Sequence, residues 1–133
     1  MSQTLMCGVV GEATTIVTLE NTAEKFGNHG AMVFATPFLV GLMEQAAIAA
    51  VRGYLAEGEG TVGTRLEIDH IAATPVGMNV RAVAKLREID GKRLIFDVEA
   101  WDDAEKVGQG QHERFIISSM KFLNKVEEKS KKR

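Results

Sequence analysis

Residues 34–55 contain the feature that most constrains the fold, a long apolar segment with an acidic side chain near its centre. Thr36 followed by a proline predicts a helix start, because the hydroxyl can cap free amides and proline needs no N–H at the first helical position. Across residues 38–51 the only polar side chains are Glu44 and Gln45. A helix that is apolar around nearly its whole circumference is normally enclosed by other elements. We therefore expect a buried central helix that carries a carboxylate in its middle.

The segments that flank this helix alternate between apolar and polar residues, which is typical of β-strands. In the strand after the helix, Val62, Leu66 and His70 fall on the apolar face. Gly63 and Asp69 fall on the opposite face. Turn residues separate the later strands, so we expect the last four strands to be connected by hairpins and to be sheet neighbours. The predicted strands span residues 13–19, 61–74, 78–89, 92–101 and 107–123.

This order of elements predicts an α+β domain in which a curved antiparallel sheet wraps one long central helix. Residues 1–124 are expected to form the domain, and the charge-rich residues 125–133 are expected to be a solvated tail that is disordered at its end. A single sheet covers only part of a helix that is apolar on all sides. A second copy of the chain is the simplest cover for the remainder, so we expect a homodimer with its sites at or near the subunit interface.

The composition argues against several classes of partner. The 133-residue chain has a net charge of only −2, which does not favour nucleic acid or an anionic membrane surface. The apolar helix is too short for a membrane span and has an acid at its centre. The single cysteine, Cys7, cannot form an internal disulfide, and the first residues show no secretory signal pattern. We therefore expect a cytoplasmic protein.

Three polar residues are candidates for catalysis. Glu44 is the strongest signal, because a carboxylate is seldom placed among apolar residues unless it has a partner. His70 lies on the inward face of its strand, and a His close to a Glu in a dry site forms an acid–base pair. Thr36 lies where a helix start presents free amides, which can polarise a carbonyl oxygen. Each also has a structural interpretation. Glu44 can cap a polar contact or face a solvent-filled seam, His70 can be a hydrogen-bonded core histidine, and Thr36 can be a helix cap.

The remaining polar residues give weaker signals. His29 lies in a glycine-bearing loop, and the pattern alone assigns His112 and Arg114 to surface charge on the last strand. No phosphate-binding loop, dinucleotide-binding glycine motif, metal-spaced Cys/His cluster or nucleophile elbow is present in the sequence. Thr36 and Glu44 lie about 12 Å apart along a straight helix, so they cannot both touch one reacting atom from it. Either Thr36 lies on a loop that folds back, or two subunits assemble the site.

Three sequence blocks together resemble a known family. They read V-F-A-T-P-F-L-V-G-L-M-E, G-E-G-T-V-G-T and H-I-A-A-T-P-V-G, and the H-E-R of residues 112–114 is a further match. In this order, from about residue 33 to residue 124, they resemble the hotdog-fold thioesterases, and among these the fluoroacetyl-CoA thioesterase type. The resemblance implies a long helix wrapped by a curved antiparallel sheet, in agreement with the fold predicted from the pattern.

The resemblance also implies a reaction, the hydrolysis of an acyl-CoA thioester without a metal ion or organic cofactor. Glu44 is then expected to attack as a nucleophile or to activate water. Donors near Thr36 hold the thioester oxygen, and His70 transfers the proton. The implied site residues are the catalytic Thr36, Glu44 and His70 and the substrate-binding Gly63, Arg114 and Phe34.

The acyl group is less well defined than the reaction. The fluoroacetyl-specific form carries aromatic residues just before V-F-A-T, where this chain has Gly27 and Gly30, and Pro37 stands where that form has glycine. We therefore expect a short or small acyl-CoA substrate and do not assign fluoroacetyl-CoA. Two alternatives stay open, a non-catalytic acyl-CoA binding module and, less favoured because its Asp–His loop motif is not evident, a hotdog hydratase or dehydratase. The basic residues available for CoA phosphates are Arg81, Lys85, Arg87, Lys92 and Arg93.

Overall fold

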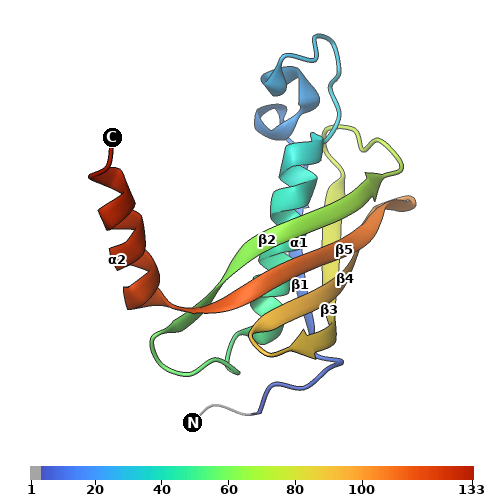
Figure 1. Cartoon of the computed structure of the whole chain (residues 1–133). Helices are drawn as coiled ribbons and strands as arrows, with labels where there is room; N and C mark the ends of the chain where they lie inside the picture. The colour runs from blue at the N-terminus through green and yellow to red at the C-terminus, as the bar shows by residue number, and fades with distance from the viewer. Residues whose placement is uncertain (1–3) are drawn as a thin grey trace.

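The computed structural model describes residues 4–133, which fold around one long helix (Figure 1). No helix within these residues is long and apolar enough to cross a membrane. In chain order the elements are β1 (Val10–Ile16), the short 3-10 helices η1 (Leu19–Asn21) and η2 (Ala23–Phe26), α1 (Thr36–Val51), β2 (Glu59–His70), β3 (Asn79–Asp90), β4 (Arg93–Asp102), β5 (Lys106–Ser118) and α2 (Ser119–Ser130).

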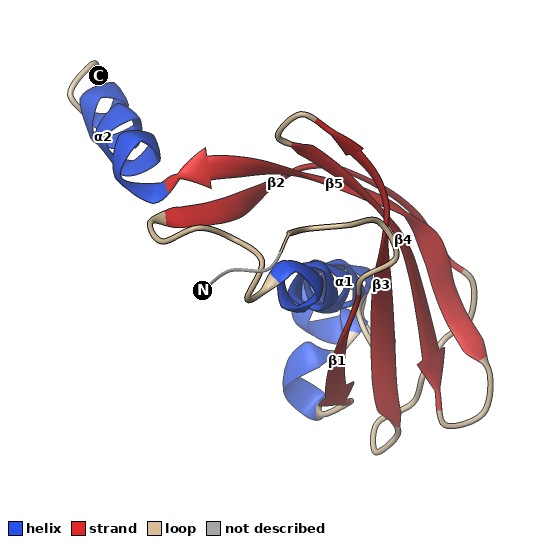
Figure 2. Cartoon of the chain, turned by 90° about the horizontal axis from the view of Figure 1, so that it is seen from below, coloured by secondary structure: helices blue, strands red, loops and turns tan. Residues whose placement is uncertain are grey.

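The five strands form one antiparallel sheet in the order β1-β3-β4-β5-β2, and this sheet curls around α1 (Figures 1 and 2). The predicted pairings of β3 with β4 and of β4 with β5 are confirmed. The expected pairing of β2 with β3 is wrong, because β2 pairs with β5 and β3 pairs with β1. The connection at 71–78 is too long for a tight hairpin. It lies instead against the segment before α1, where the Phe34 N–H donates to the Thr74 carbonyl at 2.9 Å.

The hydrophobic core lies between the inner face of α1 and the concave side of the sheet. Leu39 and Met43 of α1 are fully buried. The predicted inward alternation of β4 is confirmed, since Leu94 and Phe96 are also fully buried. Burial of this apolar surface is the main force that holds the sheet on the helix.

One glycine sets how closely β1 approaches α1. Gly11 lies against the helix backbone, and a Cβ atom at this position would overlap backbone atoms of Ala46 and Ala50. Both alanines are themselves buried, so the contact consists of small residues on both sides. The close approach closes the core beneath the edge of the sheet.

The start of α1 differs from the prediction. Ala35 occupies the N-cap position, Thr36 is already the first helical residue, and no side chain caps the helix. The prediction that Thr36 is the cap is therefore wrong. Its hydroxyl is hydrogen-bonded to His70 instead, which leaves it unavailable to the helix amides.

The outer face of α1 is open in the single chain. Phe38 is 41% exposed and Ile48 is 37% exposed. The side chain of Glu44 is 40% exposed, so the predicted burial of this carboxylate is wrong within one chain. The cause is geometric, because the sheet curls around only one side of the helix (Figure 2).

The C-terminal segment also differs from the prediction. The last strand ends at Ser118 rather than Leu123, and residues 119–130 form the exposed helix α2, where the end of the strand and a tail without regular structure were expected. Ser118 caps this helix, because its hydroxyl accepts a hydrogen bond from the Lys121 N–H. None of the residues of α2 is buried, and the helix projects away from the ends of β2 and β5 (Figure 1).

Candidate active site

The first polar cluster joins the start of α1 to the end of β2. Thr36 is the first residue of the helix, His70 is the last residue of the strand, and Thr36 Oγ1 lies 2.7 Å from His70 Nδ1. The structure therefore brings these two predicted residues together. Phe34, predicted to bind substrate, is 1% exposed and contributes to a pocket beside them. This open pocket has a volume of about 310 Å³ and is lined by Ala23, Asn28, Val33, Phe34, Thr36, His70, Ile71, Ala72 and Ala73.

The ring of His70 is suited to proton transfer. Burial lowers the pKa of His70 below the ordinary value of 6.5, and the nearby polar backbone of Ala72 partly opposes this change. The imidazole is therefore uncharged at neutral pH. Its Nδ1 is engaged by Thr36, whereas its Nε2 is buried and has no hydrogen-bond partner within residues 4–133. One ring nitrogen thus remains free for a ligand.

The helix start supplies a donor next to this ring. The Phe38 and Leu39 N–H groups both donate to the Ala35 carbonyl, at 3.0 and 3.1 Å, and Pro37 has no N–H. Within residues 4–133, the Thr36 N–H donates no hydrogen bond to the backbone of a loop or of another element. Its position at the N-terminus of α1 gives it partial positive character. This N–H can donate a hydrogen bond to a carbonyl oxygen and so stabilise the negative charge that develops on it.

The second polar cluster is built around Arg114 of β5. The pattern assigned Arg114 and His112 to the surface, and this prediction is wrong, because they are only 4% and 2% exposed. Thr61 holds the guanidinium through two bonds, from Nε to its hydroxyl at 2.9 Å and from Nη2 to its carbonyl at 3.0 Å. Arg114 Nη1 donates to Glu44 Oε2 at 3.3 Å and to His112 Nε2 at 3.2 Å. The roles of Thr61 and His112 had no signal in the alternation pattern.

Gly63 borders this cluster because β2 is irregular at that point. The pairing register of β2 with β5 shifts between Gly63 and Arg65, so the strand carries a bulge. The bulge turns Gly63 to the same side as Arg114, which corrects the predicted facing based on strict alternation. A Cβ atom at Gly63 would lie 2.8 Å from Glu44 Oε2 and 3.3 Å from Arg114 Nη1. The missing side chain therefore leaves room beside the carboxylate.

The two clusters are not brought together within one chain. Thr36 and Glu44 are separated by about 12 Å along α1. Gly63 and His70 are separated by about 20 Å along β2. Thr36 and His70 thus form one cluster, and Glu44, Gly63 and Arg114 form the other.

Comparison with known sequences identifies the family. Residues 17–120 match the sequence model of the fluoroacetyl-CoA-specific thioesterases (FlK). The chain belongs to this family. The fluoroacetyl-CoA thioesterase of Streptantibioticus cattleyicolor is 47% identical over 98 residues, which cover 74% of this chain and 70% of that protein.

Solved structures support the same assignment. A structure of the fluoroacetyl-CoA thioesterase FlK aligns with a TM-score of 0.88 and 37% identity, covering 96% of this chain and 98% of that chain. Variants of FlK have been solved with acetyl-CoA and with fluoroacetate and CoA. A hot-dog-like protein from Thermanaerovibrio acidaminovorans, 23% identical, shares the fold with a TM-score of 0.85 over 92% of this chain and 91% of that chain. The predicted hotdog fold is confirmed.

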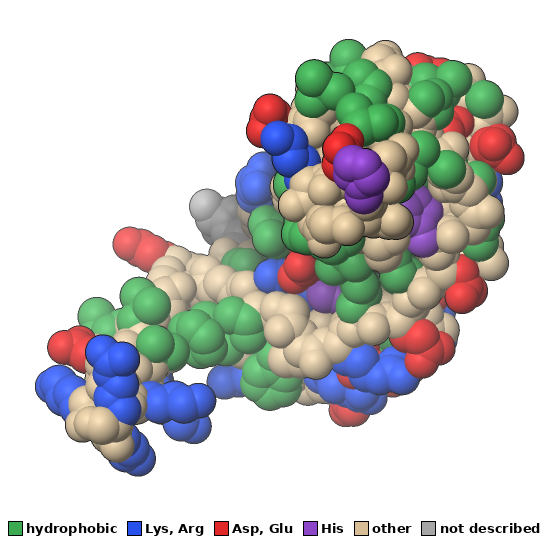
Figure 3. Space-filling model, turned by 90° about the horizontal axis from the view of Figure 1, so that it is seen from above, with side chains coloured by type: hydrophobic (Ala, Val, Ile, Leu, Met, Phe, Trp, Pro, Cys, Tyr) green, Lys and Arg blue, Asp and Glu red, His purple; other side chains and the backbone are tan. Residues whose placement is uncertain are grey.

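Three of the five basic residues predicted to bind CoA phosphates already form ion pairs within this chain. Arg81, Arg87 and Arg93 each form an ion pair with a carboxylate, at 2.6, 3.1 and 2.8 Å. Lys85 and Lys92 form no ion pair within residues 4–133. Such surface pairs are weak enough for a phosphate to displace. A second group of basic side chains, not included in the prediction, gathers on and after α2 (Figure 3).

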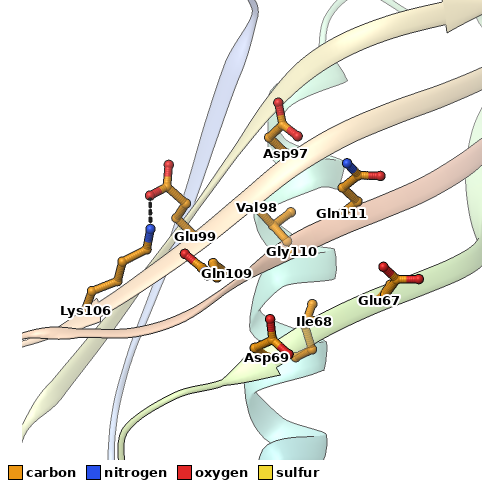
Figure 4. Close-up of a pocket in the computed structure, with 10 residues that line it drawn as sticks. All are labelled: Glu67, Ile68, Asp69, Asp97, Val98, Glu99, Lys106, Gln109, Gly110 and Gln111. Atoms are coloured by element: carbon orange, nitrogen blue, oxygen red, sulfur yellow. Dashed lines mark ion pairs between the residues drawn. The ribbon is translucent and has the colours of Figure 1, made fainter.

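A polar depression on the sheet lies apart from both clusters (Figure 4). Two of its carboxylates are neutralised, Glu99 by Lys106 at 2.7 Å and Glu67 by Arg65 at 2.8 Å. No group of three or more His, Cys, Asp or Glu residues able to hold a metal ion occurs in the described part of the chain. We interpret the depression as solvated surface. It is lined by Glu67, Ile68, Asp69, Asp97, Val98, Glu99, Lys106, Gln109, Gly110 and Gln111, and none of these is a predicted site residue.

Proposed function

We propose that this chain hydrolyses a short or small acyl-CoA thioester to a free acid and CoA. Its family membership supports this class of reaction. The observation that carries the proposal is the 2.7 Å contact between Thr36 and His70 beside an open pocket. It sets a hydroxyl, an uncharged imidazole and a helix start next to one another, and these groups can orient a carbonyl and move a proton.

The reaction also needs an oxygen nucleophile, and Glu44 supplies or activates it. In a direct attack, a Glu44 oxygen bonds to the acyl carbon, the C–S bond breaks and CoA leaves as a thiolate. Water then cleaves the resulting anhydride. In the alternative route, Glu44 takes a proton from water while the water oxygen attacks the acyl carbon, and the same C–S bond breaks. In both routes His70 transfers the proton that hydrolysis releases. The Thr36 N–H stabilises the negative charge on the carbonyl oxygen of the thioester.

An isotope experiment tests directly for the anhydride route. Excess enzyme and limiting substrate are mixed in water enriched in ¹⁸O, and the peptide that contains Glu44 is analysed by mass spectrometry. Only the anhydride route can place ¹⁸O in the Glu44 carboxylate. Label confined to the product acid is the result of the general-base route, and also of an anhydride that water attacks at its acyl carbon.

We infer that two copies of the chain complete the site, with Glu44 of one copy near the Thr36–His70 pair of the other. Three observations favour a homodimer. The outer face of α1 is open, with Phe38 and Ile48 exposed. Glu44 is 40% exposed on that face. Finally, β2 pairs with β5 on one side only, so its other edge is available for a second sheet.

The acyl group is proposed to be small, and fluoroacetyl-CoA is not assigned. Gly27 and Gly30 adopt positive φ angles of 92° and 86°, a conformation in which the aromatic residues of the fluoroacetyl-specific form would be strained. A thiol-release screen across acyl-CoAs of varied length and polarity identifies the preferred substrate. We place the enzyme in the cytoplasm, where the exposed thiol of Cys7 stays reduced.

Replacement of Glu44 tests the proposal directly. Glu44→Gln should lower kcat for the best acyl-CoA at least about 10³-fold, because the amide neither attacks nor takes a proton. The fold should persist, since the amide oxygen can still accept from Arg114. Glu57→Gln, on the exposed loop after α1, is the matched control and should hydrolyse normally. Undiminished turnover in Glu44→Gln would remove Glu44 from the mechanism.

A non-catalytic acyl-CoA binding module is the second candidate. The observation that favours it is the separation of the two clusters within one chain, because an incomplete site would bind without turnover. Calorimetry with acetyl-CoA distinguishes the two functions. Binding without thiol release over hours would support the binding module and refute hydrolysis.

A further inference from the structure

Arg114 directs most of its hydrogen-bonding capacity to its own chain. A guanidinium has five N–H groups. Four of them contact Thr61, Glu44 and His112, as described above. The fifth, on Nη2, has no partner within residues 4–133. The orientation of this remaining donor therefore depends on the three residues that hold the others.

The hydrogen bonds of His112 define its protonation state. Its Nδ1 lies 2.9 Å from the Arg65 carbonyl oxygen, which can only accept, so Nδ1 carries the hydrogen. Its Nε2 lies 3.2 Å from Arg114 Nη1, which can only donate, so Nε2 presents a lone pair. Both contacts require the same neutral form of the ring. A proton added at Nε2 would face an N–H of a fixed cation.

We propose that His112 is a positioning residue: its neutral ring holds the Arg114 guanidinium in the room left by Gly63, and protonation of the ring releases it. The inference deepens the proposed function and rests on it, because the free N–H of Arg114 is then aimed at the acyl end of the substrate. His112 acts through Arg114 and does not itself touch the substrate.

The surroundings of His112 favour the neutral ring. The charged groups that act on it are Arg114 and Glu44, which face the ring, and Glu113, the adjacent residue of β5, whose side chain lies on the other face of the strand. The ring of Phe96 from β4 lies on another side at a centroid distance of 6.4 Å. Burial is the main cause of a pKa below 6.5 for His112, and the Arg114 charge adds to it. The hydrogen bond to the Arg65 carbonyl and the charges of Glu44 and Glu113 oppose this shift. The net direction leaves the ring uncharged at neutral pH.

Two substitutions separate the two contacts of the ring. His112→Gln can place an amide oxygen near the Nε2 position, so it keeps an acceptor for Arg114 and does not titrate. His112→Asn can keep a donor for the Arg65 carbonyl but loses the acceptor for Arg114. Thiol release from the best acyl-CoA is measured for both variants between pH 5.5 and 8, and circular dichroism checks that both fold.

The proposal predicts that His112→Gln keeps most of the wild-type kcat/KM at pH 7.5, whereas His112→Asn loses about tenfold or more, the effect of leaving a buried donor unpaired. It also predicts that activity falls less steeply below pH 6.5 in His112→Gln than in the wild type. If the two variants are equally active, or the Asn variant is the more active, the ring contributes only its hydrogen bond to the Arg65 carbonyl, and the proposal is overturned.

A measurement on the free wild-type protein judges the inference without any reaction. Nitrogen-15 NMR of the histidine rings should show His112 protonated at Nδ1 and bare at Nε2, with a titration midpoint below 6.5. A ring protonated at Nε2, or charged at pH 7, would overturn the positioning role. Absence of thiol release from every acyl-CoA would instead refute the proposed function, so the two failures are distinguishable.

Discussion

At the residue scale, the candidate site depends on buried polar groups whose partners restrict what they can do. Arg114 is held by Thr61 and therefore keeps its charge beside Glu44 although it is 4% exposed. Burial lowers the pKa of Arg114 as well, and the Glu44 carboxylate opposes this effect. Gly63 contributes by having no side chain. The chemistry thus rests on a pair of opposite charges with free space next to it.

The buried His112 and the half-buried His70 predict a pH dependence of stability. Burial lowers the pKa values of His70 and His112 in the folded chain, whereas both are near 6.5 in the unfolded chain. The unfolded state therefore binds more protons below pH 6.5, and the free energy of unfolding falls as the pH drops from 6.5 through the folded values. Urea titrations from pH 7.5 to 5 measure this decline. Conversion of both histidines to Gln should flatten it, and an unchanged slope in that double variant would contradict the assignment.

At the scale of elements, backbone irregularities and close contacts position the site. The bulge in β2 turns Gly63 towards Glu44, and the start of α1 meets the end of β2 at the Thr36–His70 pair. The contact of β1 with α1 at Gly11 supports this arrangement from the opposite edge of the sheet. Each of these features is a property of how two elements meet.

Replacement of Gly11 should strongly destabilise the fold. The new Cβ of Gly11→Ala would overlap backbone atoms of α1, which cannot move aside as a flexible side chain can. We expect a loss of about 3 kcal/mol in the free energy of unfolding, measured by urea titration. Gly41→Ala is the matched control, because a Cβ at this helical glycine meets nothing within 4 Å. It should be neutral or slightly stabilising. Equal effects of the two substitutions would contradict the close approach of β1.

Removal of the C-terminal segment tests the proposed domain boundary. We propose that residues 1–124 form the catalytic unit, because α2 has no buried residue. A chain that ends at Asn124 should keep its thermal midpoint within about 2 °C, since little surface is lost from the core. A larger drop in the midpoint would mean that α2 covers a surface in the assembled protein, and sedimentation of the same truncated chain would then reveal a change in mass.

At the scale of the whole molecule, one chain supplies two incomplete clusters. The sheet covers one side of α1, and the other side exposes apolar residues together with Glu44. A homodimer would cover this face and bring the carboxylate of one copy to the imidazole of the other. The expected mass in solution is twice the chain mass of 14.5 kDa.

Mixing two inactive variants tests assembly of the site from two copies. Glu44→Gln and His70→Ala should each be inactive alone. After they are unfolded and refolded together, half of the dimers contain one copy of each, and one of their two sites has both native residues. About a quarter of the wild-type activity should therefore return. If no activity returns although mass spectrometry verifies that mixed dimers have formed, the whole site lies within a single chain.

The sequence alone predicted much of this protein. The apolar run of residues 34–55 and the alternating strands predicted a helix wrapped by a curved antiparallel sheet, because local periodicity carries that information. The resemblance of the blocks around Thr36, Glu44 and His70 identified this arrangement as the hotdog fold. The turn at Asp90 and the inward residues of β4 followed for the same reason.

Only the tertiary structure decided the remainder. The pairing of β2 with β5, the burial of His112 and Arg114, and the exposure of Glu44 depend on contacts between residues far apart in the chain. A single bulge reverses the facing of every residue beyond it, so alternation could not place Gly63. The helical form of residues 119–130 also escaped prediction, because its apolar residues Met120, Leu123 and Val126, spaced as on one helix face, were divided between a predicted strand and a predicted tail. Local pattern determines which elements form, whereas long-range packing determines which side chains meet.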